Sequence, residues 1–148
     1  MRIATTTSKF VLDSYGWVEY AIGSEMGDLV RVALESGTCY TPSIVIAELA
    51  DKFSREGQTA DWENLYNFVR GKTKILILDA NSARQSGLRK TEIRTRIKDF
   101  GLADAIIYQA SVENGALLVT GDEHFEDFQD VIYLKRIEEA REKIQNVE

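Results

Sequence analysis

The sequence predicts an α/β domain in which helices cover both faces of a mainly parallel central sheet, as a three-layer α/β/α sandwich. The prediction rests on two observations. Short apolar runs alternate with longer amphipathic segments, and the runs begin at Phe10, Thr38, Lys74, Ala116 and Val131. Several runs are almost continuously hydrophobic, as expected for strands buried on both faces of a parallel sheet.

The first strand is expected at Phe10–Leu12, directly before Asp13. Ser14 is the expected N-cap of a helix over Tyr15–Ile22, because a hydroxyl side chain satisfies free N–H groups at a helix start. Gly23 is expected to end that helix. Asp13 is therefore an acid that directly follows a buried strand.

A second helix is expected over Glu25–Glu35 and a brief strand at Thr38–Thr41. The pair Thr41-Pro42 indicates a helix start, with Thr41 as N-cap and Pro42 at the first helical position. The helix that follows should run over Pro42–Arg55.

The expected helix over Pro42–Arg55 places Val45, Leu49 and Phe53 on one face, at the spacing i, i+4, i+8. Glu48 lies within this otherwise apolar segment. Burial of an acid costs free energy unless the acid is paired or bound to a metal. Glu48 therefore needs a partner.

The rest of the chain continues the alternation of helices and strands. The expected elements are a helix at Asp61–Arg70, a strand at Lys74–Leu78, a mostly helical segment at Ala80–Lys98 with a break at Ser86-Gly87, a last strand at Val131–Leu134 and a terminal helix at Lys135–Asn146.

Two further acids lie in the segment between these elements. A helix that begins near Leu102 and runs to about Asn114 carries Asp104 in its first turn. The apolar run Ala116–Thr120 follows as a buried strand, and Asp122 stands just after it.

Length and composition favour one globular domain spanning residues 1–148. The chain is 44% hydrophobic and 28% charged, which suits a soluble protein with its own core. Its single cysteine, Cys39, excludes an internal disulfide and fits a reducing compartment. No apolar run approaches the ~20 residues of a membrane span, and Met1–Ser8 lacks the apolar stretch of a signal peptide. We therefore expect a cytoplasmic protein.

The acids Asp13, Glu48, Asp104 and Asp122 all lie at strand ends or in helices beside them. Each alone has a simpler interpretation, as a cap, a helix-dipole charge or a loop acid. In a parallel sheet, however, these positions share the edge at which ligands bind. Carboxylates gathered there repel one another unless a cation lies among them, and oxygen ligands suit Mg²⁺. No cluster of Cys or His offers a zinc site.

The net charge of −6 argues against a broad basic surface for nucleic acid. The segment Arg84–Lys98 is nevertheless locally basic and contains Arg89, Arg94 and Arg96. A solvated helix face is the alternative interpretation of this segment.

Four sequence stretches together resemble the PIN-domain family, particularly its VapC-type ribonuclease toxins. They are FVLDSYGW, PSIVIAELADKF, GLADAIIYQAS and GALLVTGDEHF, and they span nearly the whole chain in the order and approximate spacing of the family. The resemblance implies a PIN-like α/β/α sandwich and a nuclease that depends on Mg²⁺ or Mn²⁺.

The resemblance also assigns roles to residues. Asp13, Glu48 and Asp104 match the core metal-binding acids of the family, and Asp122 matches the acid after the fourth strand. These acids would be both the catalytic residues and the metal ligands.

Three neighbouring positions also bear on the resemblance. Ser14 and Thr120 match small hydroxyl positions beside the acids, where they would orient a ligand or water. The family commonly has a basic or polar residue where this chain has Gly121.

The implied reaction is hydrolysis of an RNA phosphodiester that leaves a 5′-phosphate and a 3′-hydroxyl. Arg89, Arg94 and Arg96 are the predicted contacts to the RNA backbone. The toxin resemblance further implies a homodimer and an antitoxin protein that occupies the active-site groove. A housekeeping RNA-processing PIN nuclease is the alternative within the same family.

Other classes of protein also place acids at strand ends. A phosphorylated receiver needs an acidic neighbour of its first Asp, which Asp13 lacks, and Leu134-Lys135 is a weak match to its late Lys. A haloacid-dehalogenase-type enzyme needs Asp-x-Asp where this chain has Asp13-Ser14-Tyr15. A metal-binding interaction module without turnover is disfavoured by the intact set of acids.

Overall fold

The computed structural model describes residues 8–145 and contains one parallel sheet flanked by helices. Its elements are β1 (Lys9–Leu12), α1 (Ser14–Ile22), α2 (Glu25–Ser36), β2 (Thr38–Pro42), α3 (Ser43–Arg55), α4 (Thr59–Lys72), β3 (Lys74–Leu76), α5 (Ala80–Ile93), α6 (Leu102–Glu113), β4 (Leu117–Thr120), the 3-10 helix η1 (Glu123–Phe125), β5 (Val131–Tyr133) and α7 (Ile137–Gln145). The five strands are ordered β3-β2-β1-β4-β5.

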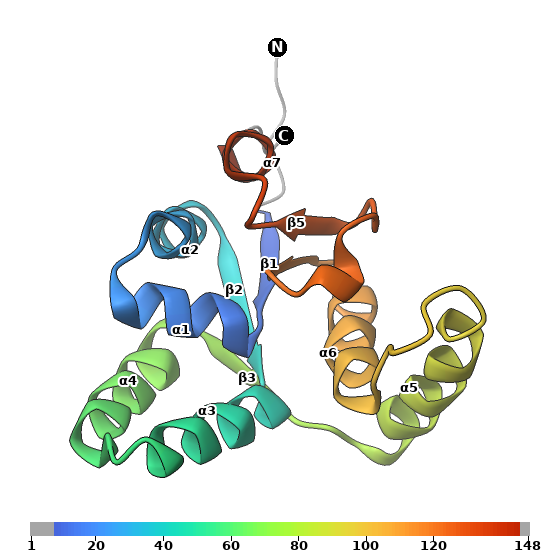
Figure 1. Cartoon of the computed structure of the whole chain (residues 1–148), viewed down its shortest axis with the longest axis horizontal. Coiled ribbons are helices and arrows are strands. Elements are labelled where there is room, and N and C mark those ends of the chain that lie inside the picture. The colour runs from blue at the N-terminus through green and yellow to red at the C-terminus, as the bar shows by residue number, and fades with distance from the viewer. Residues whose placement is uncertain (1–7, 146–148) are drawn as a thin grey trace.

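Helices lie on both faces of this sheet. Figure 1 shows α1–α4 on one side and α5 and α6 on the other. Right-handed crossovers explain the division, because the chain first steps from β1 outward to β2 and β3 and then reverses to reach β4 on the far side of β1. The predicted three-layer α/β/α sandwich is confirmed, and every strand pair is parallel.

The two neighbouring central strands supply much of the core. Phe10, Val11 and Leu12 of β1 and Leu118 and Val119 of β4 have no exposed surface. Val11 pairs with Leu118, and Leu12 pairs with Val119. The residues that follow these two strands are therefore fixed to a rigid support.

Two expected helix starts differ from the structure. Asp13, not Ser14, is the N-cap of α1, and its carboxylate accepts a hydrogen bond from the Gly16 amide. Pro42 ends β2 instead of beginning α3, which starts at Ser43. The Thr41 side chain is buried in the core, where its hydroxyl accepts a hydrogen bond from the Trp17 indole, so it does not cap α3.

The middle of the chain departs from the expected boundaries. The strand expected over Lys74–Leu78 stops at Leu76, and Ile77 is 74% exposed. β3 is an edge strand that pairs only with β2, so little holds it beyond the end of its partner. α5 continues through Ser86-Gly87 without a break and ends at Ile93, before the expected Lys98.

The final helix is shorter than expected and runs over Ile137–Gln145, while Asn146 lies outside the described residues. α7 packs against α2, and their apolar residues cover each other. The prediction that Met1–Ser8 is not a signal peptide concerns residues that lie almost wholly outside the described range 8–145. Within that described range, every helix is too short or too polar to cross a bilayer.

Candidate active site

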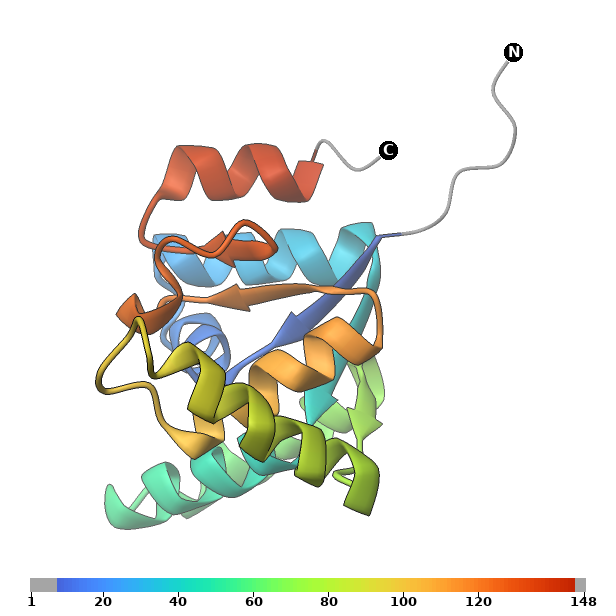
Figure 2. The same cartoon turned by 90° about the vertical axis from the view of Figure 1, so that its right-hand side faces the viewer.

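An open cavity of about 820 Å³ lies where the strand order reverses, between the carboxyl ends of β1 and β4. Such switch points are the usual ligand sites of open α/β sheets. In Figure 2 the η1 helix, drawn in orange-red, lies at this edge beside the loop between α5 and α6. We call the cavity the acid pocket, because Asp13, Glu48, Asp104 and Asp122 all line it.

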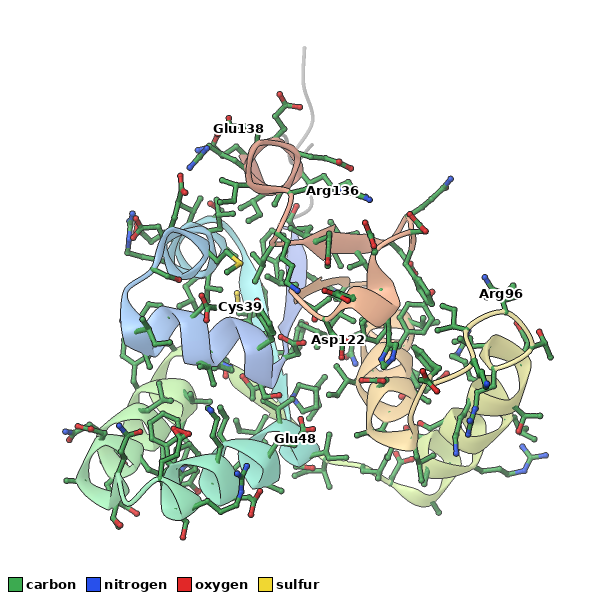
Figure 3. All side chains as sticks on the ribbon, in the orientation of Figure 1. Cys39, Glu48, Arg96, Asp122, Arg136 and Glu138 are labelled. Carbon is green, nitrogen blue, oxygen red and sulfur yellow. The ribbon has the colours of Figure 1, made fainter. Side chains whose placement is uncertain are left out.

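The acids of the acid pocket come from four separate elements. Asp13 follows β1, Asp122 follows β4, Glu48 lies in the second turn of α3, and Asp104 lies in the first turn of α6. Figure 3 labels Glu48 and Asp122 near the centre of the molecule, between the helices of the two faces. Helices that connect parallel strands begin at the carboxyl edge of the sheet, which is why residues so distant in sequence meet.

Asp13 is the most enclosed of these acids, with 5% of its surface exposed. One carboxylate oxygen accepts the Gly16 amide at 2.9 Å, and the other accepts the Thr120 hydroxyl. The Thr120 oxygen in turn accepts the Asp122 amide at 3.0 Å. Thr120 thus links the acid after β1 to the acid after β4.

Glu48 and Ser14 form a second connection across the acid pocket. The Ser14 hydroxyl donates to a Glu48 carboxylate oxygen at 3.0 Å. This bond joins α1 to α3, and it satisfies one oxygen of an acid that stands in an apolar segment. Ser14 therefore contacts a site acid although it does not cap the helix.

Among the described residues, Asp104, Asp122 and His124 bring three side chains of metal-ligating type close together. His124 Nδ1 lies 3.0 Å from an Asp104 oxygen and 3.3 Å from an Asp122 oxygen. One ligand atom from each of the three residues lies within 4.8 Å of the others. Asp104 also accepts the Gly101 amide at 3.1 Å, which fixes its carboxylate at the start of α6.

Burial and mutual repulsion make the charged forms of these acids costly. Burial raises the pKa of Asp13 from 3.8 to about 7, with Asp122 and Glu48 adding to the shift and the Thr120 and Gly16 hydrogen bonds opposing it. Burial, together with nearby acids, also raises the pKa values of Glu48 and Asp104. A cation among these oxygens would offset this cost.

The residues of the acid pocket fit a hard divalent cation. Carboxylate oxygens are the ligands that Mg²⁺ and Mn²⁺ prefer. The raised pKa values of three pocket acids, caused first by burial and then by neighbouring acids, mean that their charged forms are costly unless a cation lies close by. Asp104, Asp122 and His124 would hold one ion, and Asp13 and Glu48 line the same cavity.

The arginines expected to contact RNA do not line the acid pocket. Arg89 donates to the Gln109 side chain at 2.6 Å and lies over the Tyr108 ring. Arg94 donates to the Lys98 carbonyl at 3.0 Å, and Figure 3 shows Arg96 at the outer loop after α5. Their proposed contact with RNA would therefore lie outside the pocket.

The cations that do line the acid pocket are Lys52, Arg55 and Lys135. The sequence analysis did not assign them to the site, because none of them lies in the segment Arg84–Lys98, where cations are most concentrated in the sequence. His124 was not assigned to the site either, because a lone histidine after a turn is more often structural or incidental. Its position two residues after Asp122, in a turn closed by the hydrogen bond from its own amide to Asp122, was the available clue.

Comparison with known proteins connects this geometry to a family. None of the curated protein sequences matches the chain. Among solved structures, VapBC2 from Rickettsia felis bound to a promoter DNA fragment superposes with a TM-score of 0.68 at 19% identity, covering 84% of this chain and 96% of that one. DNA-bound VapBC from Salmonella typhimurium gives 0.66 at 19% identity, covering 84% and 95%.

VapC20 from Mycobacterium tuberculosis, a toxin that cleaves the sarcin-ricin loop, gives a TM-score of 0.64 at 13% identity, covering 82% of this chain and 98% of that one. At these identities the likeness concerns the fold. The sequence profile of the PIN domain matches residues 10–131, which is most of the chain. The chain therefore belongs to the PIN domain family.

Proposed function

We propose that this protein is a metal-dependent endoribonuclease and the toxin of a type II toxin–antitoxin pair. The observation that carries the proposal is the convergence of Asp13, Glu48, Asp104 and Asp122 on one cavity at the switch point of a PIN-domain sheet. Three of these acids have raised pKa values, as expected for a site that is complete only with a cation.

A divalent cation, Mg²⁺ or Mn²⁺, would supply a Lewis acid that activates water and offsets charge on the phosphate. The protein groups would hold that ion and orient the substrate around it. Thr120 and Ser14 fix the Asp13 and Glu48 carboxylates through direct hydrogen bonds. Gly101 and His124 do the same for Asp104.

The partner in this proposal is an antitoxin protein. The structures named above are of VapBC assemblies and a VapC toxin, and the matched regions cover nearly all of those chains. A homodimer and a cytoplasmic location belong to the same proposal. α2 and α7 pack against each other, so their apolar residues do not need a partner protein to cover them.

The test is cleavage of a mixed RNA substrate by the purified protein with Mg²⁺, with Mn²⁺ and with EDTA. We expect cleavage that needs the metal and is lost in Asp13→Asn. Asp127→Asn is a matched control, because its side chain is 94% exposed and lies outside the acid pocket. Equal cleavage in EDTA, or an unaffected Asp13→Asn variant, would refute the proposed chemistry.

A further inference from the structure

Gly121 allows an aromatic ring to lie at the wall of the acid pocket. A Cβ atom at position 121 would lie 2.1 Å from Tyr15 Cε1 and within 2.6 Å of two further ring carbons. Any side chain there would displace the ring. Gly121 is also not among the glycines with positive φ, so the ring and not the backbone conformation requires glycine.

The Tyr15 ring in turn lies beside a cation that lines the same cavity. The Lys135 ammonium is 5.7 Å from the ring centroid, within the range of a cation–π interaction. Tyr15, Gly121 and Lys135 all line the acid pocket. Lys135 directly follows Leu134, whose amide donates to the Thr120 carbonyl at 2.8 Å, so its backbone is tied to the end of β4.

The ion partner of Lys135 in the structure is weakly held. Lys135 Nζ lies 3.1 Å from a Glu123 oxygen, but the Glu123 side chain is 76% exposed. Exposed ion pairs contribute little free energy. A phosphate of a bound polyanion would therefore compete well for this ammonium group, beside a cavity whose walls are otherwise rich in carboxylates.

We propose that Lys135 binds a backbone phosphate of the RNA strand next to the cleaved bond, and that the Tyr15 ring positions its ammonium group. This inference rests on the proposed function and adds the residue that binds the substrate. It also explains why glycine stands at position 121, because any side chain there would displace the ring beside Lys135.

Salt dependence of RNA binding tests the inference without requiring cleavage. Binding of a labelled single-stranded RNA to the Asp104→Asn protein is measured by fluorescence anisotropy at several salt concentrations. One lost phosphate contact lowers the slope of log K against log salt by ~0.7 and weakens binding by about fivefold near 0.1 M salt. We expect this loss in Lys135→Gln and no loss in Lys74→Gln, whose exposed lysine lies at the opposite end of the strands.

Changing Glu123, the ion partner of Lys135, gives a second test in which RNA binding should become tighter instead of weaker. Glu123→Gln releases Lys135 and is expected to tighten RNA binding, beyond the effect of Glu138→Gln, which removes an equal charge from an 84% exposed side chain on α7. The tighter RNA binding of Glu123→Gln should disappear in the double variant that also carries Lys135→Gln. If Lys135 served only to pair with Glu123, neither Lys135→Gln nor Glu123→Gln would change RNA binding beyond its control variant, and the inference would be overturned.

The role of the ring is tested separately. Tyr15→Phe should keep the slope of the parent protein, whereas Tyr15→Ala and Gly121→Ala should each reproduce the loss seen in Lys135→Gln. An unchanged slope in Tyr15→Ala would overturn the positioning role.

The outcomes separate this inference from the proposed function. Metal-dependent cleavage by the unmodified protein, with Lys135→Gln and Lys74→Gln binding RNA alike, would overturn only the inference. Failure of every variant to bind RNA would also overturn it, and the cleavage assay then shows whether the proposed function fails as well.

Discussion

The acid pocket and the basic segment Arg84–Lys98 concentrate opposite charges by different means. The acids are far apart in sequence and converge because four elements meet at one edge of the sheet. The arginines are close in sequence but diverge, and Arg89 and Arg94 bond to groups on their own side of the molecule. In this chain the cations that are clustered in sequence do not meet in one cavity, whereas single acids at equivalent topological positions do.

The largest expected effect comes from removing one charge from the acid pocket. Asp104→Asn should lower metal-dependent cleavage by more than about 100-fold, because loss of an inner ligand exceeds the effect of losing a supporting hydrogen bond. The fold should persist, since the amide oxygen still accepts the Gly101 amide. The measurement is RNA cleavage alongside circular dichroism. Full activity would remove Asp104 from the mechanism.

The second prediction concerns stability without metal. The pKa of Asp13 is about 7 in the folded protein against 3.8 for an unperturbed aspartate, so the folded state binds more protons between these values. The free energy of unfolding therefore falls as pH rises from about 4 to 7. Asparagine does not ionise, so Asp13→Asn should avoid up to about 4 kcal/mol of this decrease. In the absence of metal at pH 8, the variant should therefore have a higher free energy of unfolding than the unmodified protein.

Denaturant unfolding in EDTA between pH 4 and 8 checks this stability prediction. Asp127→Asn should retain the pH dependence of the unmodified protein, because its side chain is 94% exposed and lies outside the acid pocket. Added Mg²⁺ should stabilise the unmodified protein more than Asp13→Asn, because the variant lacks one of the charged groups that line the cavity. A free energy of unfolding that rises between pH 4 and 7 in EDTA would contradict the raised pKa of Asp13.

A smaller effect is expected from the hydroxyl that joins two strand ends. Thr120→Val removes the bonds to the Asp13 carboxylate and the Asp122 amide, and cleavage should fall by about tenfold. Thr41→Val is the matched control, because it removes a buried hydroxyl that bonds to Trp17 and Thr73 outside the pocket. The control should lower the unfolding temperature without lowering cleavage per folded molecule.

The smallest effect is expected in the basic segment. Arg94→Gln and Arg96→Gln should each weaken binding of a long RNA by about twofold and leave a short RNA unaffected, because contacts there lie outside the pocket. Anisotropy with RNAs of two lengths measures this. A tenfold loss of affinity for the short RNA would contradict this prediction, because it would place these arginines at the cleaved bond.

Periodicity and topology made most of the fold predictable. The spacing of Val45, Leu49 and Phe53 correctly gave the buried face of α3, and all three side chains are buried. Apolar runs gave every strand. The alternation of strands and helices was enough to place the acids on one edge, because parallel connections leave few other arrangements.

The errors came from signals that depend on context. Thr41-Pro42 has the pattern of a helix start, but the same pair also suits the end of a strand, where Pro42 does not need an amide donor. Lys74–Leu78 is apolar enough for a longer strand, yet only β2 is available to pair with it. Lys135 reaches the acid pocket through tertiary packing, which no local pattern encodes.

The position of Asp13 also has a consequence for relatives of this protein that lack the proposed activity. Its carboxylate caps the start of α1 as well as lining the pocket, so folding constrains this position independently of the proposed activity. Alanine there would remove a helix cap worth about 1 kcal/mol, whereas asparagine would preserve it. Inactive relatives with an intact fold should therefore carry asparagine, serine or threonine at this position more often than alanine.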